Sequence, residues 1–356
     1  MKILALVLLR LLISLPLYAM EQQEKAKCLW EAIRTGNIEE VRQQLDNAEQ
    51  GGTLQQLLEA REKIFGRTAL MLAAEQGCEE IVKMLLQKRH ESGVLKLLLE
   101  AQHKSVTEKH TEKAFEGYKY IANNLLKINQ LLAKDNSGVT ILFFPVANGH
   151  EGVLNILLQE AENFNILPQL LLAQNKADGG TVLRLAGARG HEQMTKLLMP
   201  KAEDHGCLRQ LLEATDKSGC IALGEIAASG RVNTGLLFLQ AAEKYKILQD
   251  QLKQYGLQIL KTAMGHKEFF DLILQEAERY GLLKQLLQQR DENGETLVIH
   301  AAYHRSIYFV NSLLTKAKQY GILKEQLQIK DNKGRTALTA AQHMKNENVI
   351  QLLQVI

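Results

Sequence analysis

Two histidines at helical spacing come closest to forming a chemical site in this sequence. His300 and His304 stand four positions apart in the segment HAAYH, so a helix would place both imidazoles on one face. Such a pair could supply two ligands to a transition metal, but a catalytic metal site needs a third protein ligand. No other histidine, cysteine or carboxylate stands at a spacing that indicates one. A metal-dependent hydrolase that uses this pair is therefore only an alternative interpretation.

Other motifs and the composition also argue against catalysis. The sequence has no G-K-[ST] phosphate loop and no G-x-S-x-G nucleophile turn. Its net charge of +3 falls to about +1 without residues 1–19, and aromatic residues make up only 5%. A cationic or base-stacking surface for nucleic acid is thus not indicated. We expect a non-enzymatic protein with no metal, no cofactor and no nucleic-acid ligand.

The chain opens with MKILALVLLRLLISLPLYAM, in which a lysine precedes an apolar run. This pattern predicts a secretory signal peptide over residues 1–19, cleaved near Ala19, and a short linker over residues 20–27. We then expect a secreted or periplasmic protein, or one delivered into a host cell. An uncleaved leader is the alternative, because about 17 apolar residues is a borderline length for a membrane span. It would make the chain a membrane-tethered structural envelope protein.

The four cysteines form no C-x-x-C pair and no regular ladder, so free thiols are expected. Cys207 and Cys220 are close enough in sequence to form a disulfide, and the sequence leaves that pairing open.

A pattern that recurs through the chain predicts its architecture. A short apolar segment meets a break residue, and a second segment with apolar residues at helical spacing follows. Successive breaks are 32 to 41 residues apart, and most steps are close to 40. The pattern predicts an all-α solenoid of about nine stacked helix pairs over residues 28–356. The nine break residues are Gly36, Gly77, Gly117, Gly149, Gly190, Gly230, Gly265, Arg305 and Met344.

The units resemble ankyrin repeats. The stretch 66–77 matches the pattern G-x-T-x-L-x-x-A-A-x-x-G, and residues 29–45 resemble the entry repeat of such arrays. The segment 105–126 keeps little beyond its break and second helix, and the unit at 256–265 lacks the threonine and the preceding aspartate. Partial matches occur at Gly138, Thr140, Leu142 and Gly149; at Gly180, Thr181, Leu183, Ala186 and Gly190; at Gly294, Thr296, Ala301 and Ala302; and at Gly334, Thr336, Leu338 and Ala341.

The matching residues have clear physical roles. Each threonine can cap the first helix through its hydroxyl, and each break glycine permits a left-handed backbone at the helix end. Aspartates three residues before a glycine favour tight turns. These are Asp135, Asp216, Asp291 and Asp331.

The repeats of about 40 residues exceed the usual 33 because of an added segment. QEAERYGLLKQLLQ at 275–288 has counterparts at 159–172, 200–213 and 315–328, with looser copies at 46–59, 87–100 and 240–253. Its paired leucines predict an appended short helix, and stacking would align such helices in a third row. The linker at 127–138 is interpreted as lacking this insert, which would account for the shortest step.

The resemblance implies that a protein partner binds to turn tips and inner-helix faces of a monomeric scaffold. It also implies that His150, His191 and His266 are structural helix starts, and the recurring tyrosines near the insert turn indicate packing. The candidate partner-binding residues at the tips are Asn136, Lys217, Glu292, Asn293, Asn332, Lys333 and Arg335.

Overall fold

The computed structural model describes residues 23–88, 124–304 and 306–355. In these residues the regular elements are α-helices, joined by turns and two isolated β-bridges. The chain divides into two compact units, residues 1–177 and 178–356. The expected signal peptide and the break at Gly117 lie outside the described residues.

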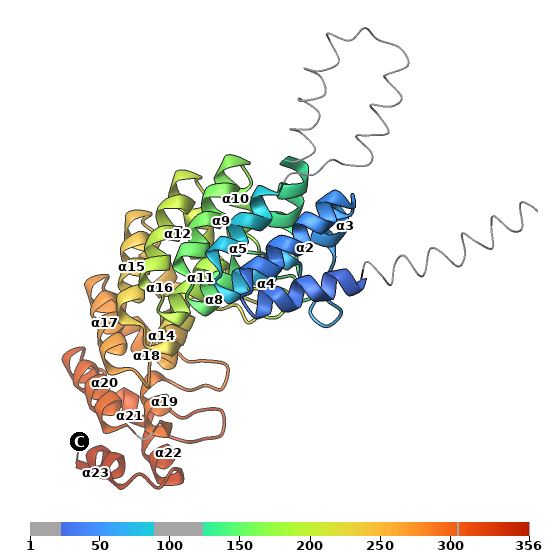
Figure 1. Ribbon diagram of the computed structural model, residues 1–356. Helices are drawn as coiled ribbons and strands as arrows, with labels where there is room; N and C mark the ends of the chain where they lie inside the picture. Colours follow the sequence, from blue (N-terminus) through green and yellow to red (C-terminus); the bar gives the residue numbers. More distant parts are fainter. Residues whose placement is uncertain (1–22, 89–123, 305, 356) are drawn as a thin grey trace, which may run out of the picture. The chain divides into compact units, whose positions relative to one another are not determined.

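The described part of the first unit contains three repeats (Figure 1). The inner helix α4 packs against α8, while the outer helix α5 packs against both α2 and α9. The helices are residues 23–34, α2 (Ile38–Gln50), α3 (Leu54–Glu59), α4 (Ala69–Gln76), α5 (Glu79–Gln87), residues 124–132, α8 (Phe143–Asn148), α9 (Glu151–Asn163) and α10 (Leu167–Leu171).

The second unit stacks its helices in rows. The inner row runs through α11, α14, α16, α19 and α22, each packed on the next, and α12, α15, α17, α20 and α23 form the outer row (Figure 1). The helices are α11 (Val182–Arg189), α12 (Glu192–Asp204), α13 (Leu208–Glu213), α14 (Ala222–Ser229), α15 (Val232–Lys244), α16 (Leu248–Thr262), α17 (Lys267–Arg279), α18 (Leu283–Gln288), α19 (Leu297–Tyr303), α20 (Ile307–Gln319), α21 (Leu323–Gln328), α22 (Ala337–His343) and α23 (Glu347–Val355).

Local signals set the ends of the inner helices. In α4, the hydroxyl of Thr68 accepts the backbone N–H of Met71, and Gly77 ends the helix in the left-handed conformation at φ 74°. The same cap begins α11, α19 and α22, and left-handed glycines also end α8, α11 and α14. The predicted roles of threonine and glycine are confirmed at these helices.

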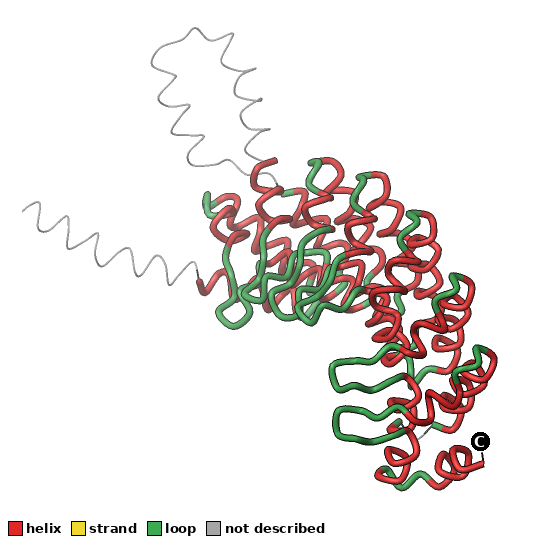
Figure 2. The backbone as a smooth tube through the Cα atoms, turned by 180° about the vertical axis from the view of Figure 1, so that it is seen from behind, coloured by secondary structure: helices red, strands yellow, loops and turns green. Residues whose placement is uncertain are grey.

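The appended short helices are also confirmed. In α18, Leu283, Leu286 and Leu287 are all buried, so the paired leucines turn one face of this short helix toward the two main rows. Equivalent short helices are α3, α10, α13 and α21, each placed between an outer helix and the next inner helix. Figure 2 shows the loops that enter and leave them.

The repeat around α16 departs from this plan. The expected appended helix and the next inner helix form one continuous helix of 15 residues, Leu248–Thr262. No aspartate turn or threonine cap interrupts the sequence there, so the backbone hydrogen bonds continue through Gly256. Gly256 lies against Leu286, and a Cβ added to it would be 2.9 Å from a methyl carbon of that leucine.

The expected break at Gly117 lies outside the described residues, and among those described α4 packs on α8 and α5 on α9. Residues 124–132 form a helix that ends two residues before the bridge of Lys134 with Thr140. The short helix α13 ends at the same offset from the bridge of Thr215 with Ile221. The prediction that 127–138 lacks an appended helix was therefore wrong.

The N-terminal boundary differs from the expectation as well. Residues 23–27, inside the linker predicted for 20–27, are already helical, and Ala26 is fully buried. Across the described residues, no helix combines the length and the apolar character that crossing a bilayer requires. All four cysteines carry free thiols, and burial raises the pKa of the Cys207 and Cys220 thiols.

Candidate functional site

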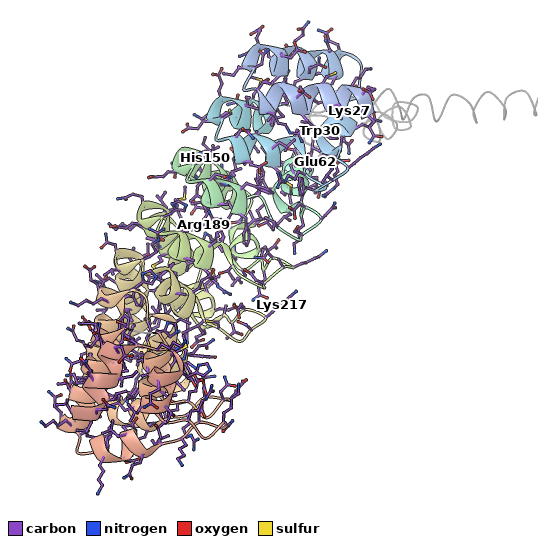
Figure 3. All side chains as sticks on the ribbon, turned by 90° about the horizontal axis from the view of Figure 1, so that it is seen from below. Lys27, Trp30, Glu62, His150, Arg189 and Lys217 are labelled. Carbon is purple, nitrogen blue, oxygen red and sulfur yellow. The ribbon has the colours of Figure 1, made fainter. Side chains whose placement is uncertain are left out.

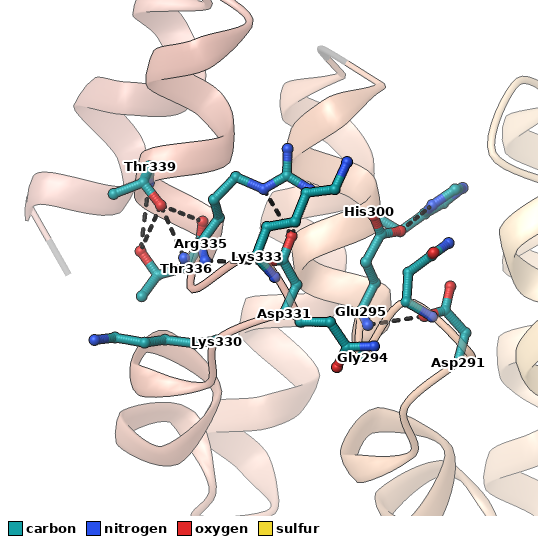
Figure 4. Close-up of polar contacts among 12 residues, drawn as sticks. Asp291, Gly294, Glu295, His300, Lys330, Asp331, Lys333, Arg335, Thr336 and Thr339 are labelled. Atoms are coloured by element: carbon teal, nitrogen blue, oxygen red, sulfur yellow. Dashed lines mark hydrogen bonds and ion pairs between the residues drawn. The ribbon is translucent and has the colours of Figure 1, made fainter.

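The loops that precede the inner helices, here called the tips, are rigid turns built around a carboxylate (Figure 4). At Asp291, Oδ1 accepts the backbone N–H groups of Asn293 at 2.9 Å and Glu295 at 2.8 Å. The same double acceptance occurs at Asp135, Asp216 and Asp331, so the predicted turn role of these aspartates is confirmed. Each tip therefore presents its central residues on a fixed backbone.

Neighbouring tips are joined by hydrogen bonds. The backbone N–H of Asn332 donates to the carbonyl oxygen of Asn293 at 2.9 Å, and its side-chain amide donates to the carbonyl of Glu292 at 2.9 Å. In the first unit, Asn136 makes the same two bonds to Phe65 and Ile64, at 2.8 and 3.1 Å. The side chains of both asparagines, which the sequence offers as partner contacts, thus already bind the adjacent tip.

The remaining candidate residues are placed differently. Glu292, Asn293 and Lys333 are exposed, and their side chains form no hydrogen bond or ion pair within the described chain. The guanidinium of Arg335 pairs with Asp331 at 2.7 Å. Figure 3 shows Lys217 at the end of its loop, where its backbone N–H donates to the carbonyl of Asp178 at 2.8 Å.

The structure gathers four candidates on two adjacent tips: Glu292 and Asn293 on one, Asn332 and Lys333 on the other. Lys217 lies on an earlier tip of the same unit. Between Lys217 and Glu292 the continuous helix α16 replaces a tip, so the row of tips is interrupted there. Asn136 belongs to the first unit.

The first tip carries an apolar surface that sequence reasoning missed. Ile64 is 77% exposed and Phe65 is 49% exposed, on a turn that Asn136 holds in place. This turn has one residue more than the D-x-x-G tips, because Glu62 is four positions before Gly66. The string EKIFG could have indicated this apolar surface, but a search for the D-x-x-G pattern alone does not find it.

Charged groups line the inner helices beside the tips of the second unit. Arg184 on α11 is buried and pairs with Asp216 at 2.6 Å and with Glu225 on α14. Burial opposes ionisation of Asp216, but hydrogen bonds from Ser218, the Cys220 backbone and Arg184 outweigh it and lower its pKa to about 2. Lys261 on α16 pairs in the same way with Asp291 and, at 3.6 Å, with Glu295.

The two histidines singled out from the sequence do meet. Nε2 of His304 lies 3.0 Å from Nε2 of His300, and Nδ1 of His300 lies 3.2 Å from a carboxylate oxygen of Glu295. Burial and the charge of Lys261 lower the pKa of His300 to about 4, against the opposing hydrogen bond with Glu295. In the described residues, no three histidine, cysteine or carboxylate groups converge as metal ligands. The geometry does not supply the three ligands of a catalytic metal site.

Two further histidines and a tyrosine connect repeats. His150 and His266 precede α9 and α17, and each ring contacts a backbone carbonyl of the preceding repeat at 2.9 Å. His191 likewise precedes α12. Tyr280 donates from α17 to Glu243 on α15, and burial followed by this bond raises its pKa to about 12. Packing between repeats, which the sequence indicated, accounts for these side chains.

Comparison with known families agrees with the repeat structure. A family model described as ankyrin repeats (3 copies) matches residues 6–94 and 52–167. Among curated proteins, none matches the chain. In the second unit, helix α11 has the same threonine cap and left-handed glycine as α4 in the matched part, and the outer helix α12 follows it. Residues 6–167 are therefore similar to ankyrin repeats, and the described residues form an all-helical repeat structure.

Proposed function

We propose that this chain is a non-enzymatic scaffold that binds a protein partner through its tips. Ankyrin repeats are a protein–protein interaction module, and the rigid tips carry this proposal. Their side chains project from backbones that intra-tip and inter-tip hydrogen bonds already hold, so binding would cost little additional ordering.

Two surfaces are suited to this role. In the second unit, Glu292, Asn293 and Lys333 offer polar side chains without internal partners, typical of the hydrogen-bonding part of an interface. In the first unit, Ile64 and Phe65 offer exposed apolar area, which supplies much of the binding energy where an interface excludes water. The partner would be a protein with both an apolar pocket and polar groups.

Substitution on matched surfaces tests the proposal. The chain without residues 1–19 would be used to capture partners from host-cell and bacterial-envelope extracts. The triple variant Glu292→Ala, Asn293→Ala, Lys333→Ala and the double variant Ile64→Ser, Phe65→Ser are compared with a third-row control. That control is Lys284→Ala, Gln285→Ala, Lys324→Ala, three exposed positions on α18 and α21. Loss of the partner from either tip variant but not from the control is expected. If all variants recovered the same amount of partner, the proposal that the tips bind it would be rejected.

We further propose that the chain is exported and acts on a host or envelope protein. The support is the apolar leader that begins the sequence. N-terminal sequencing of the exported protein tests this part independently of partner capture. A start near residue 20 is expected, whereas a start at Met1 would favour a membrane-tethered structural protein.

A further inference from the structure

We propose that His300 and His304 form a solvent-open, two-ligand site for a borderline divalent cation of the Cu²⁺, Ni²⁺ and Zn²⁺ class. This is a binding site without catalysis, and it is independent of the partner-binding function.

The distance between the ring nitrogens is the first support. Two imidazole nitrogens bound to one such ion at about 2.0–2.1 Å lie about 2.9–3.4 Å apart, for angles between square and tetrahedral. Nε2 of His300 and Nε2 of His304 are 3.0 Å apart, close to the value for a right angle. A right angle is the arrangement that Cu²⁺ and Ni²⁺ prefer. In the ion-free pair Nε2–H of His304 donates to Nε2 of His300, so chelation requires that proton to move to Nδ1 of His304 while the two nitrogens stay near this separation.

Glu295 orients the ring of His300, the less exposed of the two histidines. The Nδ1 hydrogen of His300 is directed to the Glu295 carboxylate, which leaves Nε2 as the lone-pair nitrogen (Figure 4). Metal-binding histidines commonly have a carboxylate or carbonyl on the second ring nitrogen, because it fixes the tautomer and the ring orientation. His304 is the C-cap residue of α19 and is exposed, and its Nε2 already lies beside that of His300.

The positive groups around the pair are paired with carboxylates. Lys261 on α16 is paired with both Asp291 and Glu295 on the facing tip. These three groups together carry a net charge of −1. Arg335 on the following tip is neutralised by Asp331. A dication bound at the two imidazoles would therefore not face an uncompensated positive charge.

Metal titration of the full chain tests the proposal. Cu²⁺, Ni²⁺ and Zn²⁺ are titrated separately by calorimetry at pH 7.4 into the wild type, His304→Ala and His343→Ala. His343 is a matched control: it is an exposed histidine near the end of an inner helix, with Thr339 and Glu347 four positions away on either side. We expect saturable binding with affinity in the order Cu²⁺, Ni²⁺, Zn²⁺. Affinity should fall about tenfold or more in His304→Ala, because its second ligand is lost, and stay unchanged in His343→Ala.

A spectroscopic readout identifies the ligands independently of affinity. Electron paramagnetic resonance of the Cu²⁺-loaded wild type should show two coordinated nitrogens, and His304→Ala should show one. Circular dichroism of His304→Ala confirms that the fold is kept, since this side chain is exposed. Wild-type binding too weak to saturate, or unchanged binding and nitrogen count in His304→Ala, would overturn the proposal.

Discussion

The backbone N–H of Asn332 donates to the carbonyl oxygen of Asn293, with 2.9 Å between nitrogen and oxygen, and this bond joins two successive tips. The side-chain amide of Asn332 adds a second bond, to the carbonyl of Glu292. Each tip is thus aligned by the next, although the inner helices already pack together. Alignment of the tips is what allows several of them to meet one partner at once.

Removing the side-chain bond should weaken this alignment measurably. We expect Asn332→Ala to lower the free energy of unfolding by about 1 kcal/mol, the usual contribution of a single hydrogen bond. Asn293→Ala removes an exposed amide with no internal partner, so its effect should stay within about 0.5 kcal/mol. Urea denaturation of both variants measures the difference. A loss in Asn332→Ala no larger than in Asn293→Ala would show that the side-chain bond contributes nothing.

The Asp216 carboxylate should make stability depend on pH in the acid range. Its pKa is about 2 in the folded chain against an ordinary 3.8, so the folded state favours the ionised form. The resulting stability is present above pH 4 and is lost as pH falls toward 2. At pH 6, Asp216→Asn should destabilise by about 2–4 kcal/mol, because the buried Arg184 loses a charged partner. Denaturation curves of the variant and the wild type should converge between pH 4 and pH 2.

Glu225→Gln is the matched comparison for Asp216. It removes the other carboxylate bound to Arg184, but the Glu225 side chain is 39% exposed and takes no part in a tip turn. Glu225→Gln should lower the free energy of unfolding by about 1 kcal/mol or less, as expected for a surface ion pair. An equal loss in both variants would mean that the turn around Asp216 adds nothing to stability.

The features that the sequence predicted correctly are mostly local. A threonine that caps its own helix, a left-handed glycine and an aspartate that binds the next two N–H groups all act within five residues. Their patterns therefore appear in a single repeat. The paired leucines of α18 are equally local, since helical spacing alone places them on one face.

What the sequence did not predict depends on contacts between distant residues. The packing of α4 on α8 joins two helices that are far apart in the sequence, and no pattern within one repeat indicates it. The two tip asparagines looked free because their acceptors lie on the preceding tip, 72 and 40 residues away. The fusion in α16 could have been anticipated, because the missing Asp and Thr removed the signals that end and restart a helix.

Left-handed glycines should lose different amounts of stability on substitution by alanine, according to what the added Cβ would contact. Gly230 and Gly281 are both left-handed, at φ 65° and 69°, so alanine at either is strained by about 1–2 kcal/mol. A Cβ on Gly230 would also lie 2.2 Å from the His266 ring, whereas nothing lies within 4 Å of one on Gly281. Gly230→Ala must therefore displace His266 and break its bond to Ala228. We expect it to be at least about 1 kcal/mol less stable than Gly281→Ala in urea denaturation. If Gly230→Ala and Gly281→Ala were equally stable, the expected clash with the His266 ring would be contradicted.

Gln326 offers a stabilising substitution. Its side chain is fully buried on α21, and neither its Nε2 nor its Oε1 has a hydrogen-bond partner within the described chain. Leucine occupies the corresponding position of α13 and α18, at Leu211 and Leu286. Because a buried amide without partners costs free energy, Gln326→Leu should raise the free energy of unfolding by about 1–3 kcal/mol.

Gln251 on α16 stands at the same position but should respond in the opposite direction. Its Nε2 donates to the backbone carbonyl of Leu212 at 2.8 Å, so leucine there would remove a buried hydrogen bond and leave that acceptor unsatisfied. We expect Gln251→Leu to lower stability by about 1–2 kcal/mol. Urea denaturation of both variants separates the two effects. If both substitutions stabilised the chain, apolar volume alone would govern the third row, and the bond to Leu212 would have no measurable role.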